Sequence, residues 1–144
     1  DDEILEEYFM IANQHVHVLD EFNNFMEEEI YQMMVATTED QDELILENTT
    51  TLKVARWWNR ACDIIPCNGG KDIGIQKILD YFNFNKEEAT AFGDGGNDIS
   101  MLKYVGTVVA MGNAKDNVKA IADYITDSVQ EDGIVSALKH FEII

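Results

Sequence analysis

The 144-residue sequence is poor in proline, cysteine and basic residues, and each shortage excludes a class of protein. It has one proline, two cysteines, and 10 Lys or Arg side chains against 28 Asp or Glu, for a formal net charge of -18. With only Cys62 and Cys67, neither a disulfide framework nor a zinc knuckle is supported. A large negative charge repels phosphate backbones and anionic lipid, and no basic stripe offsets it. We therefore expect neither nucleic acid nor a membrane surface as a partner.

Long apolar runs and a basic N-terminus are also missing. No stretch approaches the roughly 18 apolar residues of a membrane-spanning helix, and the acidic first residues are unlike a signal peptide, so we expect a cytoplasmic protein. The charge is unevenly placed, since residues 1–66 carry 16 acidic and 3 basic side chains, whereas residues 67–144 carry 12 and 7. With Asp1 in place of a methionine, this asymmetry predicts a piece of a longer protein.

The more acidic part is predicted to form an α+β unit. Apolar residues on one face indicate an amphipathic helix over residues 1–13. Thr38 and Gln41 form a capping box, which predicts a helix through about residue 48. Strands are predicted over residues 30–36, 52–58 and 62–66.

The second part alternates helices with short apolar strands. Helices are predicted over residues 71–82, 97–104, 115–122 and 132–141, and strands over 89–92, 107–111 and 124–126. This alternation is typical of a parallel sheet covered by helices. We therefore expect an α/β protein, with a parallel sheet and flanking helices over residues 69–144 and an α+β unit over residues 1–68.

The most informative stretch runs from Thr90 to Leu102, where a short apolar strand ends in glycines and carboxylates before a helix begins. Asp94 and Asp98 thus follow the carboxyl end of a strand, where α/β sheets bind ligands. Carboxylates suit Mg²⁺, which prefers a few of them together with waters and a substrate phosphate, and the amides of the next helix favour an anion. These residues alone fit an acidic turn with a good helix cap equally well.

Lys71 is the second candidate, because it opens a predicted helix directly after Asn68-Gly69-Gly70. A single lysine after a glycine pair is usually a solvated charge. Beside a metal-binding carboxylate it would instead neutralise phosphoryl oxygens, which is largely what phosphoryl transfer requires of a protein.

Five motifs that include these candidates stand in a fixed order along residues 63–141. They are Gly69–Gly74 (GGKDIG), Ala91–Leu102 (AFGDGGNDISML), Val109–Ala114 (VAMGNA), Ala122–Thr126 (ADYIT) and Glu131–Ile134 (EDGI). Their order closely resembles the Cof-like sugar-phosphate phosphatases of the haloacid dehalogenase superfamily. The resemblance implies the second half of a Rossmann-like core over residues 69–144 and the later part of an α+β cap domain over residues 1–68.

The resemblance also implies a reaction and a role for each matching residue. An aspartate attacks a phosphomonoester, with Mg²⁺ as cofactor, and water then hydrolyses the phosphoaspartate. Lys71 would hold the phosphoryl group and the nucleophile, and Asp94 would bind Mg²⁺. Asn97 would contact the phosphoryl group or the substrate, and Asp98 would be a partner of metal-bound water or of Lys71.

The family's nucleophile motif, Asp-x-Asp-Gly-Thr on an apolar strand, has no counterpart in this sequence. We therefore expect the nucleophile on a missing N-terminal part of the same protein, and expect this chain to be inactive by itself. The strand before Asp94 would then have an unpaired edge, so self-association is possible. The alternative is a truncated, non-catalytic module that binds phosphate or Mg²⁺, or another protein.

Two further pairs of residues have no assigned role. His15 and His17 have the spacing of two metal ligands on a strand, but without a third ligand ordinary histidines are favoured. Trp57 and Trp58 fit either cap packing or a surface over the substrate, and because adjacent strand residues face opposite ways, at most one is expected to face a ligand.

Overall fold

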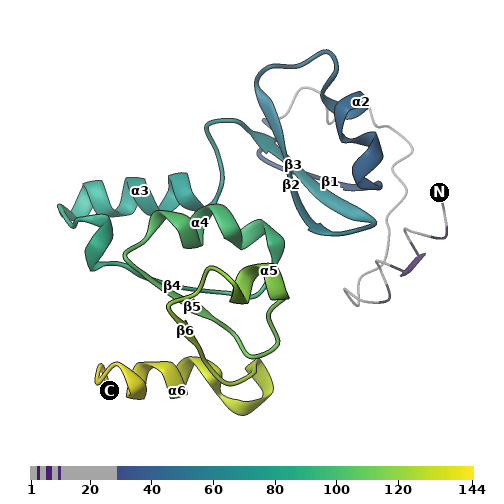
Figure 1. Cartoon of the computed structure of the whole chain (residues 1–144). Coiled ribbons are helices and arrows are strands. Elements are labelled where there is room, and N and C mark those ends of the chain that lie inside the picture. The colour runs from purple at the N-terminus through teal and green to yellow at the C-terminus, as the bar shows by residue number, and fades with distance from the viewer. Residues whose placement is uncertain (1–2, 4–5, 8–9, 11–28) are drawn as a thin grey trace. The chain divides into compact units, whose positions relative to one another are not determined.

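The computed structural model describes residues 3, 6, 7, 10 and 29–144 (Figure 1). Residues 3, 6, 7 and 10 are helical, and the rest of the helix predicted over residues 1–13 lies outside the described residues, as do His15 and His17. The chain forms two compact units, residues 1–67 and residues 68–144. In the described part of the chain no helix is both long and apolar enough to cross a membrane.

The first unit contains an antiparallel sheet with a short helical segment. Strand order is β1-β3-β2, and β2 and β3 form a hairpin through Asn59 and Arg60. The elements are β1 (Met33–Ala36), the 3₁₀ turn η2 (Glu39–Gln41), α2 (Asp42–Leu46), β2 (Leu52–Trp58) and β3 (Ala61–Pro66). Each strand predicted in this region is present, although β1 starts at Met33 rather than at residue 30.

The predicted capping box is wrong. Thr38 does precede the first turn, but its side chain makes no capping hydrogen bond. The hydroxyl of Thr37 instead donates to Gln41 Oε1 at 2.6 Å, so the glutamine side chain is already occupied. The segment consequently starts as a 3₁₀ turn, and α2 ends at Leu46, two residues before the predicted end.

The second unit contains a parallel sheet with helices, as predicted. Strand order is β4-β5-β6, with parallel pairing throughout. The strands are β4 (Thr90–Gly93), β5 (Thr107–Ala110) and β6 (Tyr124–Ile125). The helices are α3 (Lys71–Phe82), α4 (Ile99–Tyr104), α5 (Asp116–Lys119) and α6 (Gly133–His140), with 3₁₀ turns η3 (Lys86–Glu88), η4 (Gly96–Asp98) and η5 (Val129–Glu131).

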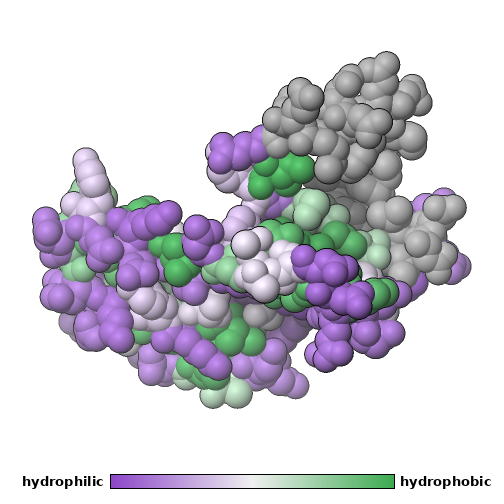
Figure 2. Space-filling model, turned by 90° about the horizontal axis from the view of Figure 1, so that it is seen from above, coloured by the Kyte–Doolittle hydropathy of each residue, from purple (hydrophilic) through white to green (hydrophobic). Residues whose placement is uncertain are grey.

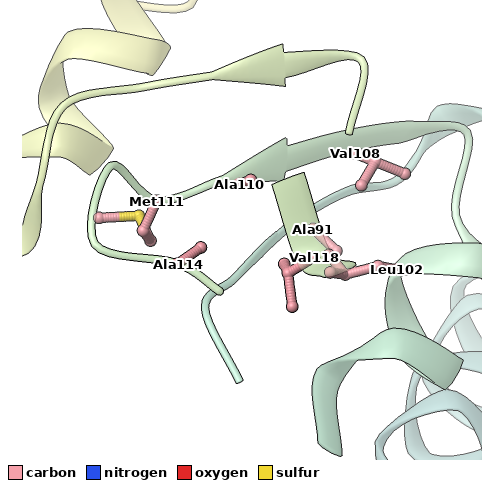
Figure 3. Packing of buried hydrophobic residues seen from close by; sticks show 7 residues of the cluster. All are labelled: Ala91, Leu102, Val108, Ala110, Met111, Ala114 and Val118. Carbon is pink, nitrogen blue, oxygen red and sulfur yellow. The ribbon is translucent and has the colours of Figure 1, made fainter. Parts of the chain in front are cut away.

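The core of the second unit lies between the sheet and the helices that follow its strands. In Figure 1, α4 and α5 lie on one side of this sheet and α6 on the other. Figure 3 shows the buried cluster, in which Leu102 of α4 and Val118 of α5 lie together with Ala91 of β4; the other members are Val108, Ala110, Met111 and Ala114. Because Leu102 and Val118 are fully buried, they hold α4 and α5 at the carboxyl end of the sheet.

Apolar side chains also remain on the surface. Figure 2 shows a mostly hydrophilic face with apolar residues gathered in patches. One group lies on and just after α3, whose described residues include none that is buried: Ile78, Tyr81, Phe82 and Phe84. The rings of Tyr81 and Phe82 meet edge to face at 5.0 Å, and Phe82 also contacts Phe84.

Candidate active site

The loop after β4 turns tightly because Gly93 has no side chain. A Cβ atom at Gly93 would lie 2.9 Å from Asp98 Cβ and 3.0 Å from Leu102 Cδ1. The chain can therefore leave the strand, form η4 and place Asp98 against the strand end. This close approach brings the end of the strand and the start of the next helix into one compact loop.

The carboxylate of Asp98 holds this loop together. Asp98 is 5% exposed, and its Oδ2 accepts hydrogen bonds from the backbone amides of Asp94 and Gly95, each at 3.1 Å. Its Oδ1 accepts a hydrogen bond from Lys71 Nζ. Burial raises the pKa of Asp98, but the hydrogen bonds from Lys71 and the two amides outweigh it, so the net pKa lies below its usual value.

Lys71 reaches this carboxylate from the first position of α3. The helix starts there because Gly70, at φ 119° and ψ 169°, adopts a backbone conformation open mainly to glycine. The Lys71 side chain is 52% exposed, whereas that of Asp98 is 8% exposed. An ammonium group has three N–H donors, so Lys71 can bind Asp98 and still present donors to an anion from solvent.

Asp94 lies on the exposed side of the same loop. Its Oδ2 accepts a hydrogen bond from Asn113 Nδ2 at 3.0 Å, and its backbone carbonyl accepts one from the amide of Lys115 at 3.2 Å. Within the described residues, the other carboxylate oxygen, Oδ1, has no hydrogen-bond partner. Asp94 thus presents one carboxylate oxygen at the carboxyl end of the sheet.

Asn97 is half-buried and lies close to Gly95. A Cβ atom at Gly95 would be 2.7 Å from Asn97 Oδ1, so the glycine makes room for this amide. The structure therefore places Asp94, Asn97 and Asp98 on one loop and brings Lys71 to it from α3.

Asn113 was not singled out as a site residue from the sequence. It lies three residues after the end of β5, and the carboxyl ends of neighbouring parallel strands meet at one edge, so the sequence indicates the region but not which polar residue contacts Asp94. The side chain bridges Asp94 to the backbone amide of Val129, which donates to Asn113 Oδ1 at 3.0 Å.

The sequence pattern of the haloacid dehalogenase-like hydrolases matches residues 2–138. The chain belongs to this family. The resemblance predicted from the five motifs is thereby confirmed, as is the α/β fold class.

Relatives and solved structures agree with this assignment. A candidate phosphatase of Bacillus subtilis (strain 168), YkrA, is 39% identical over 116 residues, which are 81% of this chain and 45% of the relative. The sugar phosphatase BT4131 of subclass IIB has a TM-score of 0.84 at 37% identity, over 100% of this chain and 55% of that chain. BT1666 of Bacteroides thetaiotaomicron, a phosphatase of the superfamily, has a TM-score of 0.85 at 34% identity, over 98% of this chain and 53% of that chain. The chain therefore spans about half the length of these proteins.

The residues present fit part of a magnesium site. Among the described residues, no group of three or more His, Cys, Asp or Glu side chains is arranged to hold a metal. Asp98 is occupied by three donors, whereas Asp94 offers one exposed carboxylate. Mg²⁺ in phosphoryl-transfer sites typically uses one or two carboxylates, waters and the substrate phosphate. Asp94 fits one such ligand, and a complete site needs oxygen atoms from elsewhere.

The tryptophan pair lies at an irregular part of β2. Strand β2 has a bulge between Arg56 and Trp58, so the simple alternation of side chains is interrupted there. The two indole rings lie nearly parallel, with centroids 6.3 Å apart. Arg56 supports the bulge by donating to the carbonyls of Thr37 and Trp58 and by pairing with Asp42.

Proposed function

We propose that this chain is part of a Mg²⁺-dependent phosphatase that hydrolyses small phosphomonoesters, sugar phosphates among them. The observation that carries the proposal is the arrangement of Lys71, Asp98 and Asp94 at the carboxyl end of β4. It places an ammonium donor and an exposed carboxylate at the edge where α/β sheets bind ligands. The similarity to a sugar phosphatase over the whole chain supports the substrate class.

Each residue has a defined task in this proposal. Lys71 binds oxygens of the phosphoryl group, and Asp98 fixes the ammonium by accepting one of its hydrogen bonds. Asn97 donates to the substrate or its phosphoryl group. Asp94 would hold Mg²⁺, which supplies positive charge next to the phosphoryl oxygens. Without such compensation, the excess of carboxylates on this chain would repel an anionic substrate.

The covalent step needs an aspartate that we place on a further segment of the same protein. Its carboxylate oxygen forms a bond to phosphorus while the bond from phosphorus to the leaving oxygen breaks, and this oxygen takes up a proton from a general acid that we place on the same segment. Water then attacks the phosphoaspartate, which releases phosphate and restores the carboxylate. Residues 69–144 would be the second half of the catalytic core, and residues 1–68 the later part of the cap.

Two features of the second unit support a missing neighbour. Among the described strands, β4 pairs only with β5, so its other edge carries unpaired backbone groups. The aromatic group on α3 exposes Tyr81 and Phe82 on the same unit. A core segment that adds a strand beside β4 would pair this edge, and a segment that packs on α3 would cover these apolar side chains. Self-association is the other way to cover them.

Both cysteines are free, which fits the reducing cytoplasm as the proposed location.

Activity of the intact protein tests the proposal. We expect Mg²⁺-dependent hydrolysis of p-nitrophenyl phosphate and of hexose phosphates, and no turnover by the 144-residue chain alone. Asp94→Ala should lower kcat/KM about 100-fold or more, since the proposed Mg²⁺ ligand is lost and with it the positive charge beside the phosphoryl group. Asn117→Ala, an exposed residue of α5, is the matched control and should retain activity. Full activity of Asp94→Ala at moderate Mg²⁺ would contradict the proposal.

A further inference from the structure

Asn113 joins two segments that are distant in the sequence. Its Nδ2 donates to Asp94 Oδ2 at 3.0 Å, on the loop after β4. Its Oδ1 accepts a hydrogen bond from the amide of Val129 at 3.0 Å, at the start of η5. Both polar atoms of the side chain are therefore used, although the residue lies on the surface.

The direction of this amide is determined by its partners. A backbone amide can only donate, so the atom facing Val129 must be the oxygen of Asn113. The NH₂ group then faces Asp94, whose ionised carboxylate can only accept. The reverse orientation would place oxygen against the carboxylate and N–H against N–H, so both contacts would become repulsive.

The donor at Val129 is itself held in place by close backbone packing. Gly112 precedes Asn113, and a Cβ atom there would lie 2.6 Å from the Ser128 nitrogen. This close approach lets the Gly112 amide donate to the carbonyl of Asp127 at 3.0 Å. The buried hydroxyl of Thr126 also donates to the Gly133 carbonyl at 2.6 Å, which closes the segment before α6. The bridge thus runs from a packed segment to an exposed carboxylate.

We infer that Asn113 is a positioning residue for the metal ligand Asp94, an inference that rests on the function proposed above. By holding Oδ2, it fixes the rotation of the carboxylate and leaves Oδ1 directed to the ligand site. Oδ1 has no hydrogen-bond partner within the part of the chain that the structure describes. A carboxylate fixed before the metal arrives binds it more tightly than one that must first be ordered, and loss of such a supporting partner typically costs about 10–100-fold in metal affinity.

An NMR titration of the ¹⁵N-labelled intact protein, which supplies the remaining ligands of the proposed site, with Mg²⁺ tests the inference. In the wild type, the side-chain NH₂ signals of Asn113 should shift together with the backbone amide of Asp94. Asn113→Ala should raise the dissociation constant about 10-fold or more. Asp94→Ala should abolish the shifts, and Asn117→Ala should leave the constant within about twofold, because that exposed amide has no described contact with the site.

The outcomes separate this inference from the proposed function. Unchanged Mg²⁺ affinity in Asn113→Ala, with binding lost in Asp94→Ala, overturns the positioning role and leaves Asp94 as a ligand. Shifts that persist in Asp94→Ala, or a wild type without shifts at this site, overturn the metal role of Asp94 and the inference with it. If Asn113→Ala does not fold, the wild-type titration still decides: NH₂ signals that stay fixed while Asp94 shifts overturn the inference.

Discussion

At the scale of single residues, Asp98 makes more hydrogen bonds than its neighbours in the site. Its carboxylate accepts from Lys71 and from the amides of Asp94 and Gly95. We expect Asp98→Asn to lower the free energy of unfolding by about 1–3 kcal/mol at neutral pH, because a neutral amide replaces the charged acceptor of three donors. Urea denaturation measures this difference.

The same variant has a defined pH dependence. Folding lowers the pKa of Asp98, so its ionised form stabilises the folded protein at any pH above the unfolded pKa of about 3.9. This contribution to stability is lost as the pH falls through the lower pKa of the folded state. The stability difference between wild type and Asp98→Asn should therefore be constant at neutral pH and shrink below about pH 4. Asp127→Asn, at an exposed site, is the control and should leave the free energy of unfolding at neutral pH unchanged within about 0.5 kcal/mol. A gap that widens in acid would contradict the lowered pKa.

The residue scale also shows how far a sequence can specify a site. Asp94, Asn97 and Asp98 were predictable as one loop, because they are close in sequence and follow an apolar strand. Lys71 and Asp98 are 27 positions apart in the sequence, so their contact could be predicted only from the family resemblance. The roles of these residues stay predictions. Asn113 lies 19 residues after Asp94, and no local pattern indicates which polar group follows the next strand closely enough to bond it.

At the scale of elements, replacing either of two glycines with alanine should change the free energy of unfolding, but in opposite directions. Gly112→Ala should lower the free energy of unfolding by about 1–3 kcal/mol, since the new methyl group would lie 2.6 Å from the backbone of Ser128 and force a shift. Gly74→Ala, inside α3 with nothing within 4 Å of the new Cβ, should raise it by about 0.5–1 kcal/mol. Urea unfolding of both variants provides the measurement, and equal effects would refute the packing argument at Gly112.

The elements of the second unit were predictable because helical and strand periods alternate along residues 69–144. The residues at which these elements begin and end were less predictable. Helix α5 stops at Lys119 rather than at 122, because the Ile121 and Ala122 amides bond three residues back and tighten the last turn. The predicted capping box at Thr38 is absent because the hydroxyl of the neighbouring Thr37 donates to the Gln41 side chain instead.

At the scale of the whole molecule, the uneven charge predicts an uneven response to salt. Residues 1–66 have 16 acidic and 3 basic side chains, and residues 67–144 have 12 and 7. Like charges on a compact chain repel one another, and raising the ionic strength from about 0.01 to 0.1 M shortens the Debye length from about 30 to 10 Å. Screening should therefore stabilise the first unit more than the second.

Hydrogen exchange measured at the two ionic strengths resolves this effect by unit. We expect the protection of amides in β2 and β3 to rise more with NaCl than that of amides in β4 and β5. Screening also weakens the described ion pairs of the first unit, but the partly buried pair of Arg56 with Asp42 is screened little, and the more exposed pair of Arg60 with Glu7 contributes little. KCl at equal ionic strength should have the same effect as NaCl, since screening does not depend on the cation. A larger gain in β4 and β5, or a loss of protection in both units, would show that contacts other than net repulsion dominate.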